Sequence, residues 1–296
     1  LNPSSAASDV YKRQINKYYS SELIERRKKL MPFTWNHIYE NGKLFGDSLK
    51  NSNFSLTNNK IFSYPGYNEI LTGEADSTIN SNAKIYNKNV TVLEKLNQTN
   101  NYKNKIAAFT SWDVFPYIIN DKRSGIPVNA GYMQESNVNT PVVDYINKNQ
   151  IRTPVIWENV RLDVYTHNFA LEYIKKKKPK LVYIAYGETD DFAHDGEYDF
   201  YINSLNYTDN MIAELWNYVQ GNKFYKDNTY FIITTDHGRG LMEDWSGHGT
   251  SKASWLAILG PNIKKTGLVE GKFYTNQIAE TIMQISKKSK TKIPTD

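Results

Sequence analysis

Five side chains of metal-ligand type occur in three separate stretches of the sequence. Asp190 and His194 lie in Gly-Glu-Thr-Asp-Asp-Phe-Ala-His, Asp236 and His237 lie in Thr-Thr-Asp-His-Gly, and His248 lies in Ser-Gly-His-Gly. These stretches hold three of the five histidines of the chain. Carboxylate and imidazole groups are the usual protein ligands of zinc and related divalent ions. The pattern therefore indicates a metal-dependent hydrolase.

The local sequence around each ligand predicts how it is presented. Asp190 and His194 are four residues apart, so a helix places both on one face, within reach of one ion. Asp236 and His237 follow a β-branched and aromatic run, residues 230–235, which predicts a buried strand. In open α/β sheets, binding sites form at the carboxyl ends of strands. Alone, each pattern also fits a surface pair or an ordinary turn, whereas the ordered set favours a metal site.

The ordered set resembles the metal ligands of the alkaline phosphatase superfamily. This superfamily includes phosphomonoesterases, nucleotide pyrophosphatase/phosphodiesterases, cofactor-independent phosphoglycerate mutases and sulfatases. The resemblance implies that Asp190, His194 and His248 bind one metal ion and that Asp236 and His237 bind a second. Two divalent ions are the implied cofactors, and the three imidazoles favour zinc. The family also uses one more aspartate, at the end of its first strand.

The same resemblance identifies a nucleophile. The segment Ser63-Tyr-Pro-Gly-Tyr-Asn-Glu-Ile-Leu-Thr-Gly73 is similar to the family's nucleophile turn, in which a hydroxyl residue precedes x-Pro and a helix that ends in Thr-Gly. A helix amino-terminus directly after Ser63 supplies N–H groups and a partial positive charge for a phosphate. Ser63 also fits the role of a helix cap, and that role does not exclude catalysis.

The implied chemistry is the in-line displacement of a phosphate ester. In the two-metal arrangement, one ion activates the Ser63 hydroxyl and the other takes the leaving oxygen, with a phosphoseryl intermediate between the two half-reactions. Asn82 resembles an amide that donates to a phosphoryl oxygen in phosphodiesterase-like members. Lys122 and Arg123 resemble a pair that clamps the terminal phosphate in some phosphomonoesterases. A turn asparagine and an ordinary basic loop are the alternatives, and we interpret His37 and His167 as structural.

The amino-terminal residues predict that part of the natural protein is missing. Residues 4–14 read as the in-frame translation of an adapter used for sequencing libraries, so we expect the natural sequence to begin no earlier than Ile15. The first strand, its metal-binding aspartate and any signal peptide would then be lost. Asp47 is not expected to replace that aspartate, because no buried apolar strand precedes it. Members of the family are usually exported, so a periplasmic or secreted protein is expected.

Composition limits the class of protein. With 296 residues and 40% hydrophobic content, residues 15–296 are expected to form a single catalytic domain. No run of 18 apolar residues occurs, so no membrane span is predicted. The net charge of +5 suits a small anionic ester. The run from Lys175 to Lys178 precedes Pro179 at a helix end, which favours a solvated helix end over nucleic-acid binding. The oligomeric state stays open.

Strand and helix patterns alternate along the chain. Strands are predicted at residues 105–109, 181–186, 230–235 and 255–259, and helices at residues 31–41, 90–97, 162–177, 198–219 and 275–285. Such alternation predicts an α/β fold with a mostly parallel sheet covered on both faces. With the resemblance, the expected fold is a three-layer α/β/α sandwich of the alkaline phosphatase type that lacks its first strand.

Two other functions fit parts of the pattern. Sulfatases share the hydroxyl or thiol, the proline and the Leu-Thr-Gly of the nucleophile turn, but Tyr67 stands where their arginine is expected. Sulfatases also favour one calcium ion held by oxygens, whereas this chain offers imidazoles. A non-catalytic protein that binds phosphate or serves as a scaffold is the alternative of another class. The preference for monoesters or diesters is left open.

Overall fold

The computed structural model of the chain describes residues 17–240 and 242–288. The segment interpreted as adapter-derived, residues 4–14, lies outside the described residues. The chain divides into two compact units. Unit 1 comprises Leu1–Phe45, Glu188–Ile233 and Leu256–Val269, and unit 2 comprises Gly46–Gly187, Thr234–Trp255 and Glu270–Asp296.

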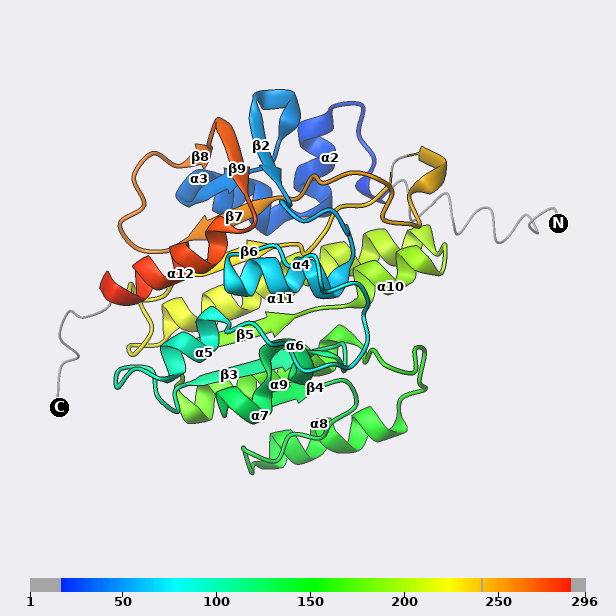
Figure 1. Ribbon diagram of the computed structural model, residues 1–296. Coiled ribbons are helices and arrows are strands. Elements are labelled where there is room, and N and C mark those ends of the chain that lie inside the picture. The colour runs from blue at the N-terminus through cyan, green and yellow to red at the C-terminus, as the bar shows by residue number, and fades with distance from the viewer. Residues whose placement is uncertain (1–16, 241, 289–296) are drawn as a thin grey trace. The chain divides into compact units, whose positions relative to one another are not determined.

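Unit 2 is built on a parallel sheet of three strands in the order β4-β3-β5 (Figure 1). The central strand is β3 (Ile106–Thr110), and its neighbours are β4 (Val128–Ala130) and β5 (Leu181–Ala185). Every residue of β3 is buried, as expected for a parallel strand that helices cover on both faces. The carboxyl ends of all three strands therefore meet at one edge of the sheet.

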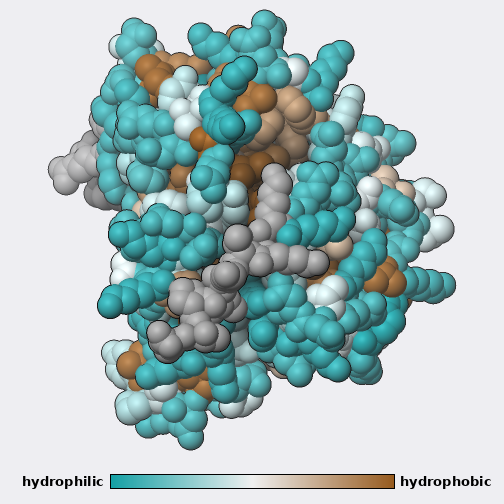
Figure 2. Space-filling model, turned by 90° about the vertical axis from the view of Figure 1, so that its left-hand side faces the viewer, coloured by the Kyte–Doolittle hydropathy of each residue, from teal (hydrophilic) through white to brown (hydrophobic). Residues whose placement is uncertain are grey.

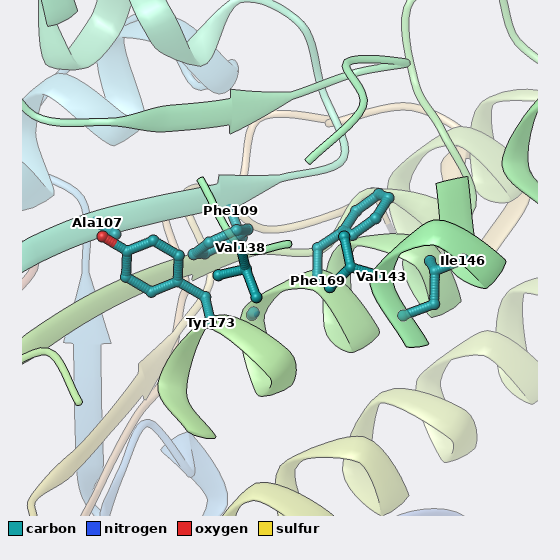
Figure 3. Packing of buried hydrophobic residues seen from close by; sticks show 8 residues of the cluster. Ala107, Phe109, Val138, Val143, Ile146, Phe169 and Tyr173 are labelled. Atoms are coloured by element: carbon teal, nitrogen blue, oxygen red, sulfur yellow. The ribbon is translucent and has the colours of Figure 1, made fainter. Parts of the chain in front are cut away.

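Helices cover both faces of this sheet. Ala107 and Phe109 point to the face covered by α8 (Pro141–Arg152) and α9 (Asp163–Lys177), where a buried apolar cluster forms (Figure 3). On the opposite face, the ring of Tyr183 packs on Phe115 of α6 (Phe115–Ile119), with ring centroids 5.6 Å apart. Unit 2 thus contains the helix, sheet and helix layers that the sequence predicts.

The remaining elements of unit 2 surround this layered core. Two strands, β2 (Ser52–Ser55) and β9 (Gly271–Tyr274), pair in parallel. The helices are α4 (Ser63–Thr72), α5 (Val92–Asn97), α7 (Asp121–Ser124) and α12 (Gln277–Lys288), with short 3-10 turns at Ser48–Lys50 and Met242–Asp244.

Unit 1 packs helices beside a second sheet. The sheet order is β6-β7-β1-β8, formed by β6 (Phe231–Thr234), β7 (Leu256–Leu259), β1 (Lys43–Phe45) and β8 (Gly267–Leu268). The helices are α2 (Leu23–Leu30), a π-helix at Phe33–Ile38, α3 (Tyr39–Asn41), α10 (Glu188–His194) and the long α11 (Tyr198–Gly221). The buried carboxylate of Asp209 on α11 accepts the N–H groups of Phe33 and Thr34, which ties the π-helix to α11.

The predicted strands and helices are confirmed to within a few residues, and the α/β class with parallel strands is confirmed as well. A short strand that was not predicted, β1, ends two residues before Asp47. That strand has three residues and a single buried side chain, Leu44, which is too short a pattern to read from sequence. Among the described helices, none has both the length and the apolar character needed to cross a bilayer. Hydrophilic side chains predominate on the face shown in Figure 2.

Candidate active site

Ser63 is the first residue of α4. Phe62 before it is extended, with φ −145° and ψ 176°, and the first helical hydrogen bond runs from Gly66 N–H to the Phe62 carbonyl. The N–H groups that precede Gly66 therefore have no acceptor within the helix, and Pro65 has no N–H to satisfy. Because the Tyr64 N–H donates to Asn82 Oδ1, this end of α4 presents the Ser63 hydroxyl together with the Ser63 N–H and the positive end of the helix dipole.

Gly66 lets α4 approach the segment that carries two predicted ligands. A Cβ atom added to Gly66 would lie 2.3 Å from the carbonyl oxygen of Asp236, so only glycine fits this contact. The close approach places Ser63 Oγ 3.3 Å from Nε2 of His237. The structure thus brings together the predicted nucleophile and the Asp236-His237 pair, which are 173 and 174 residues apart in the sequence.

His237 is oriented so that Nε2 faces Asp236 and Ser63. Its Nδ1 lies 2.9 Å from the carbonyl oxygen of Gly238, which can only accept, so the ring proton resides on Nδ1. Nε2 then lies 3.3 Å from Oδ2 of Asp236 as well as near Ser63. An imidazole nitrogen and a carboxylate oxygen at this distance can both serve as ligands of one cation. A backbone carbonyl behind the ring is the usual support for a metal-ligating histidine.

The side chains of Asp236 and His237 are both largely buried, so a charge on either is poorly solvated. The side chains of His237 and Asp236 are only 4% and 14% exposed. Burial, and next to it the negative charge of Asp236, raises the pKa of the Tyr183 phenol, which therefore stays neutral. Buried carboxylates are normally paired or coordinate metals, so the donor set of one imidazole nitrogen and one carboxylate oxygen fits a divalent ion of the zinc type.

A folded loop brings His248 against His237. The two ring centroids are 3.9 Å apart, and a nitrogen of each ring lies within 4.8 Å of the other. The loop turns back because Gly240 N–H donates to the Gly247 carbonyl, and Gly249, with φ +59°, packs directly on Gly240. The positive φ and the close contact with Gly240 explain why glycine occupies position 249.

Arg239 is a functional residue that the sequence interpretation missed. Its Nη1 donates to the carbonyl oxygens of Ser246 at 2.9 Å and Trp245 at 3.4 Å. These carbonyls precede His248 by two and three residues, so Arg239 braces the loop that carries this ligand. The available signal was a basic side chain two residues after His237 in Asp-His-Gly-Arg.

Asp190 and His194 lie on α10 in unit 1. The predicted helix is present, and Oδ2 of Asp190 is 3.4 Å from Nε2 of His194. The two side chains therefore share one helix face, and both are partly exposed, at 34% and 43%. Within unit 1 this pair offers one oxygen and one nitrogen ligand to a single ion.

Asn82 lies beside the start of α4. Its Oδ1 accepts the N–H of Tyr64 at 2.9 Å, which holds the Asn82 side chain at this helix end. The irregular segment that carries Asn82 is held further along by Tyr64 Oη, which donates to the Ile85 carbonyl, and by an ion pair of 2.6 Å between Lys84 and Asp113. Burial raises the pKa of the Tyr64 phenol, so it remains a donor. This placement suits the predicted contact of Asn82 with a phosphoryl oxygen.

Arg123, the second residue of the predicted phosphate clamp, uses its donors within the fold. Its Nε and Nη2 donate to the two carboxylate oxygens of Glu94 at 2.8 and 2.9 Å. Its other donors bond the carbonyl oxygens of Asn87, Lys88 and Asn89, so all five N–H groups are used. The bidentate bond to Glu94 raises the pKa of Arg123. Lys122 is exposed, and its ammonium lies over the ring of Tyr86, 4.6 Å from the centroid.

Both histidines interpreted as structural have packing partners. His37 stacks on Phe33 with centroids 5.0 Å apart, and buried His167 places Nδ1 2.9 Å from Tyr186 Oη. Phe115 is 1% exposed and belongs to the core.

Comparisons with known proteins bear on fold and family. Several solved structures share the fold, among them the lipoteichoic acid synthase LtaP from Listeria monocytogenes, with a TM-score of 0.60 at 14% identity, over 86% of this chain and 65% of that one. A protein of the alkaline phosphatase superfamily from Vibrio parahaemolyticus matches with a TM-score of 0.55 at 14% identity, over 86% of this chain and 60% of that one. The phosphonate monoester hydrolase SpPMH from Silicibacter pomeroyi matches with a TM-score of 0.52 at 11% identity, over 87% of this chain and 68% of that one. The chain spans less than two thirds of the length of the first two.

At these identities the likeness establishes the fold, which is that of the alkaline phosphatase superfamily. No curated protein matches the sequence. A family model described as the Metalloenzyme superfamily matches residues 63–287, which is most of the chain and includes Ser63 and all five predicted ligands. The chain therefore belongs to the Metalloenzyme superfamily.

Proposed function

We propose that this protein is a metal-dependent hydrolase of phosphoric esters that uses Ser63 as its nucleophile. One observation carries the proposal: Ser63 Oγ, at the amino-terminus of α4, lies 3.3 Å from Nε2 of His237, which in turn lies 3.3 Å from Oδ2 of Asp236. A hydroxyl beside a nitrogen ligand and a carboxylate ligand, with a helix dipole behind it, is an arrangement suited to attack on phosphorus.

The metal ligands divide as the family resemblance implies. Asp236 and His237 would hold the ion beside Ser63, and Asp190, His194 and His248 would hold the other. When bound, the ions would lower the pKa of the serine hydroxyl and neutralise charge on the phosphoryl oxygens. Three imidazoles among five ligands favour zinc over calcium or magnesium.

The side chains of this chain then perform the transfer itself. Ser63 Oγ forms a bond to phosphorus as the bond to the leaving alcohol breaks, which gives a phosphoserine and the free alcohol. Water then attacks the phosphoserine, so that the Ser63 hydroxyl is restored and phosphate is released. The amino group of Asn82 and the Ser63 N–H at the start of α4 would donate to the phosphoryl oxygens in both steps. Their position beside the Ser63 end of α4 supports this role.

A sulfuric ester is the alternative substrate. Tyr67 occupies the place of the sulfatase arginine, and its ring packs edge to face on Phe115 with centroids 4.6 Å apart, so an aromatic contact stands where sulfatases have a cation. This contact favours phosphoric over sulfuric esters.

The test is an assay of the zinc-loaded protein against an aryl phosphate, a bis-aryl phosphate and an aryl sulfate. The proposal predicts hydrolysis of at least one phosphoric ester, with loss of activity in a chelator and recovery with zinc. Faster hydrolysis of the sulfate would assign the protein to the sulfatases. Tight zinc binding without hydrolysis of any of the three would support a non-catalytic role.

A further inference from the structure

A buried network of polar side chains lies at the carboxyl edge of the sheet in unit 2. It includes a guanidinium and a carboxylate that are 0% and 1% exposed, Arg161 and Asp163. Its other members come from the end of β3, from β4 and from the first turns of α9, and they are Ser111, Asn129 and Thr166. None of these residues is a predicted ligand or the predicted nucleophile, and the proposed chemistry assigns them no role.

Arg161 holds three elements together. Its Nε donates to Thr166 Oγ1 at 2.8 Å, and its Nη1 donates to Asn129 Oδ1 at 2.6 Å and to the Met133 carbonyl at 3.2 Å. Burial lowers the pKa of Arg161 to about 9, against the opposing charges of Asp163 and Glu135, so it is protonated at neutral pH. Buried ion pairs rarely add stability over an apolar core of equal volume. The orientation that this network gives its side chains is therefore a better guide to its role than its contribution to stability.

Asp163 links the network to the segment that follows β5. Its Oδ1 accepts the Ser111 hydroxyl at 2.6 Å and the N–H of Gly187 at 2.7 Å. Gly187 lies two residues beyond the end of β5 and directly before α10, which begins at Glu188. From the same helix as Asp163, His167 reaches the hydroxyl of Tyr186 at 2.9 Å. Side chains of α9 thus hold two consecutive residues at the point where the chain leaves for α10.

We propose that Asp163, oriented by Ser111 and the Arg161 network, is a positioning residue that fixes the backbone from which the ligands Asp190 and His194 are presented. The inference rests on the proposed function, because it assigns Asp163 a purpose in metal binding. Only two residues separate Gly187 from Asp190, so a backbone fixed at Gly187 limits where α10 can begin. Partners that orient metal ligands without touching the ion typically contribute tenfold or more to metal affinity.

The test compares Asp163→Asn and Ser111→Ala with the unsubstituted protein. Asp144→Asn is the matched control, because Asp144 is an exposed carboxylate on α8. Zinc affinity is measured by competition with a chromophoric chelator, and amide hydrogen exchange is followed in the metal-free protein by mass spectrometry of peptides. Ser111→Ala removes one donor to Asp163 and provides a milder variant should Asp163→Asn fail to fold.

The inference predicts that Asp163→Asn weakens zinc binding by about tenfold and speeds exchange specifically at residues 187–194. Ser111→Ala should change both in the same direction by less, and Asp144→Asn should change neither. Unaltered zinc affinity in Asp163→Asn or Ser111→Ala, whatever happens to melting temperature, would overturn the inference and leave Asp163 a stabilising residue only. Absence of zinc binding by the unsubstituted protein would instead refute the proposed function. In that case the exchange rates still test the positioning role, which is refuted if residues 187–194 exchange at the same rate in every variant as in the unsubstituted protein.

Discussion

Two polar regions of unit 2 resemble phosphate-binding elements in sequence, and they differ in what their donors do. At the first, Asn82 uses its carbonyl oxygen on the N–H of Tyr64, the residue after Ser63. At the second, Arg123 spends all five N–H groups on Glu94 and three carbonyl oxygens. Residue type and order along the chain can suggest which side chains bind a substrate. Whether the donor groups of such a side chain are available depends on the protein oxygens that lie near them in the fold.

Glu94 explains why the second region is structural. Its side chain is 3% exposed, so its charge must be neutralised within the fold. Arg123 supplies that charge from a position 29 residues away in the sequence. At Asn82 no buried charge makes such a demand, and the segment is anchored instead through Lys84 and Asp113.

The largest loss of activity is expected from substitution of Ser63, which lies next to the residue that Asn82 contacts. Ser63→Ala should lower kcat/KM for the preferred phosphate ester by about 10⁴-fold or more, because the covalent route is lost. Zinc content should stay close to that of the unsubstituted protein. The measurement is steady-state kinetics together with metal analysis, with Ser77→Ala, an exposed serine, as the control. Retained turnover in Ser63→Ala would assign the nucleophile elsewhere.

His237 should show the next largest effect, because it joins Ser63 to the predicted ligands. His237→Ala removes a ligand nitrogen, and zinc affinity should fall by more than the roughly 10- to 100-fold typical of outer partners of a ligand. Competition with a chelator measures this change. His37→Gln, which alters a histidine stacked on Phe33, should leave zinc affinity unaltered. Equal affinity in both variants would remove His237 from the metal site.

Asn82→Ala should lower kcat by roughly 100-fold, the usual effect of one lost donor to a developing phosphoryl charge. KM should change much less, since such a donor acts most strongly in the transition state. Asn80→Ala, an exposed neighbour in the same segment, is the matched control. An effect confined to KM would indicate that Asn82 binds the ground state of the substrate only.

Arg123→Met should affect stability and leave catalysis nearly unchanged, in contrast to Asn82→Ala. Removal of the guanidinium leaves buried Glu94 unpaired, and the free energy of unfolding should fall by roughly 2–4 kcal/mol, less than for a fully buried pair because Arg123 is partly exposed. Urea unfolding of the metal-free protein measures this loss. Adding Glu94→Gln should recover part of it. A large fall in kcat/KM with unaltered stability would restore Arg123 as a substrate ligand.

Much of the fold could be predicted because its strands and helices carry strong periodic patterns. The runs that become β3, β5, β6 and β7 are apolar and bounded by breakers, and α10 and α11 follow helical spacing. The short strands β1 and β4 have three residues each and too little pattern to detect. Helix α8 also went unpredicted, although Thr140 caps it and Pro141 begins it.

The site was less accessible to sequence for a physical reason. Ser63 and His237 could be named from their motifs, because each motif is a local run of residues. The roles of Arg239, Arg161 and Asp163 depend on partners brought close only by folding, such as Gly187 for Asp163. The engagement of Arg123 by Glu94 was hidden for the same reason.

The central claim is that Ser63 attacks phosphorus, and trapping the covalent intermediate tests it most directly. The zinc-loaded protein is mixed with an aryl phosphate, quenched in acid during turnover, digested and examined by peptide mass spectrometry. The account predicts phosphate on the peptide that contains Ser63 and its absence from the same peptide of Ser63→Ala. Continued turnover with phosphate on another residue, or with Ser63 never modified, would contradict it.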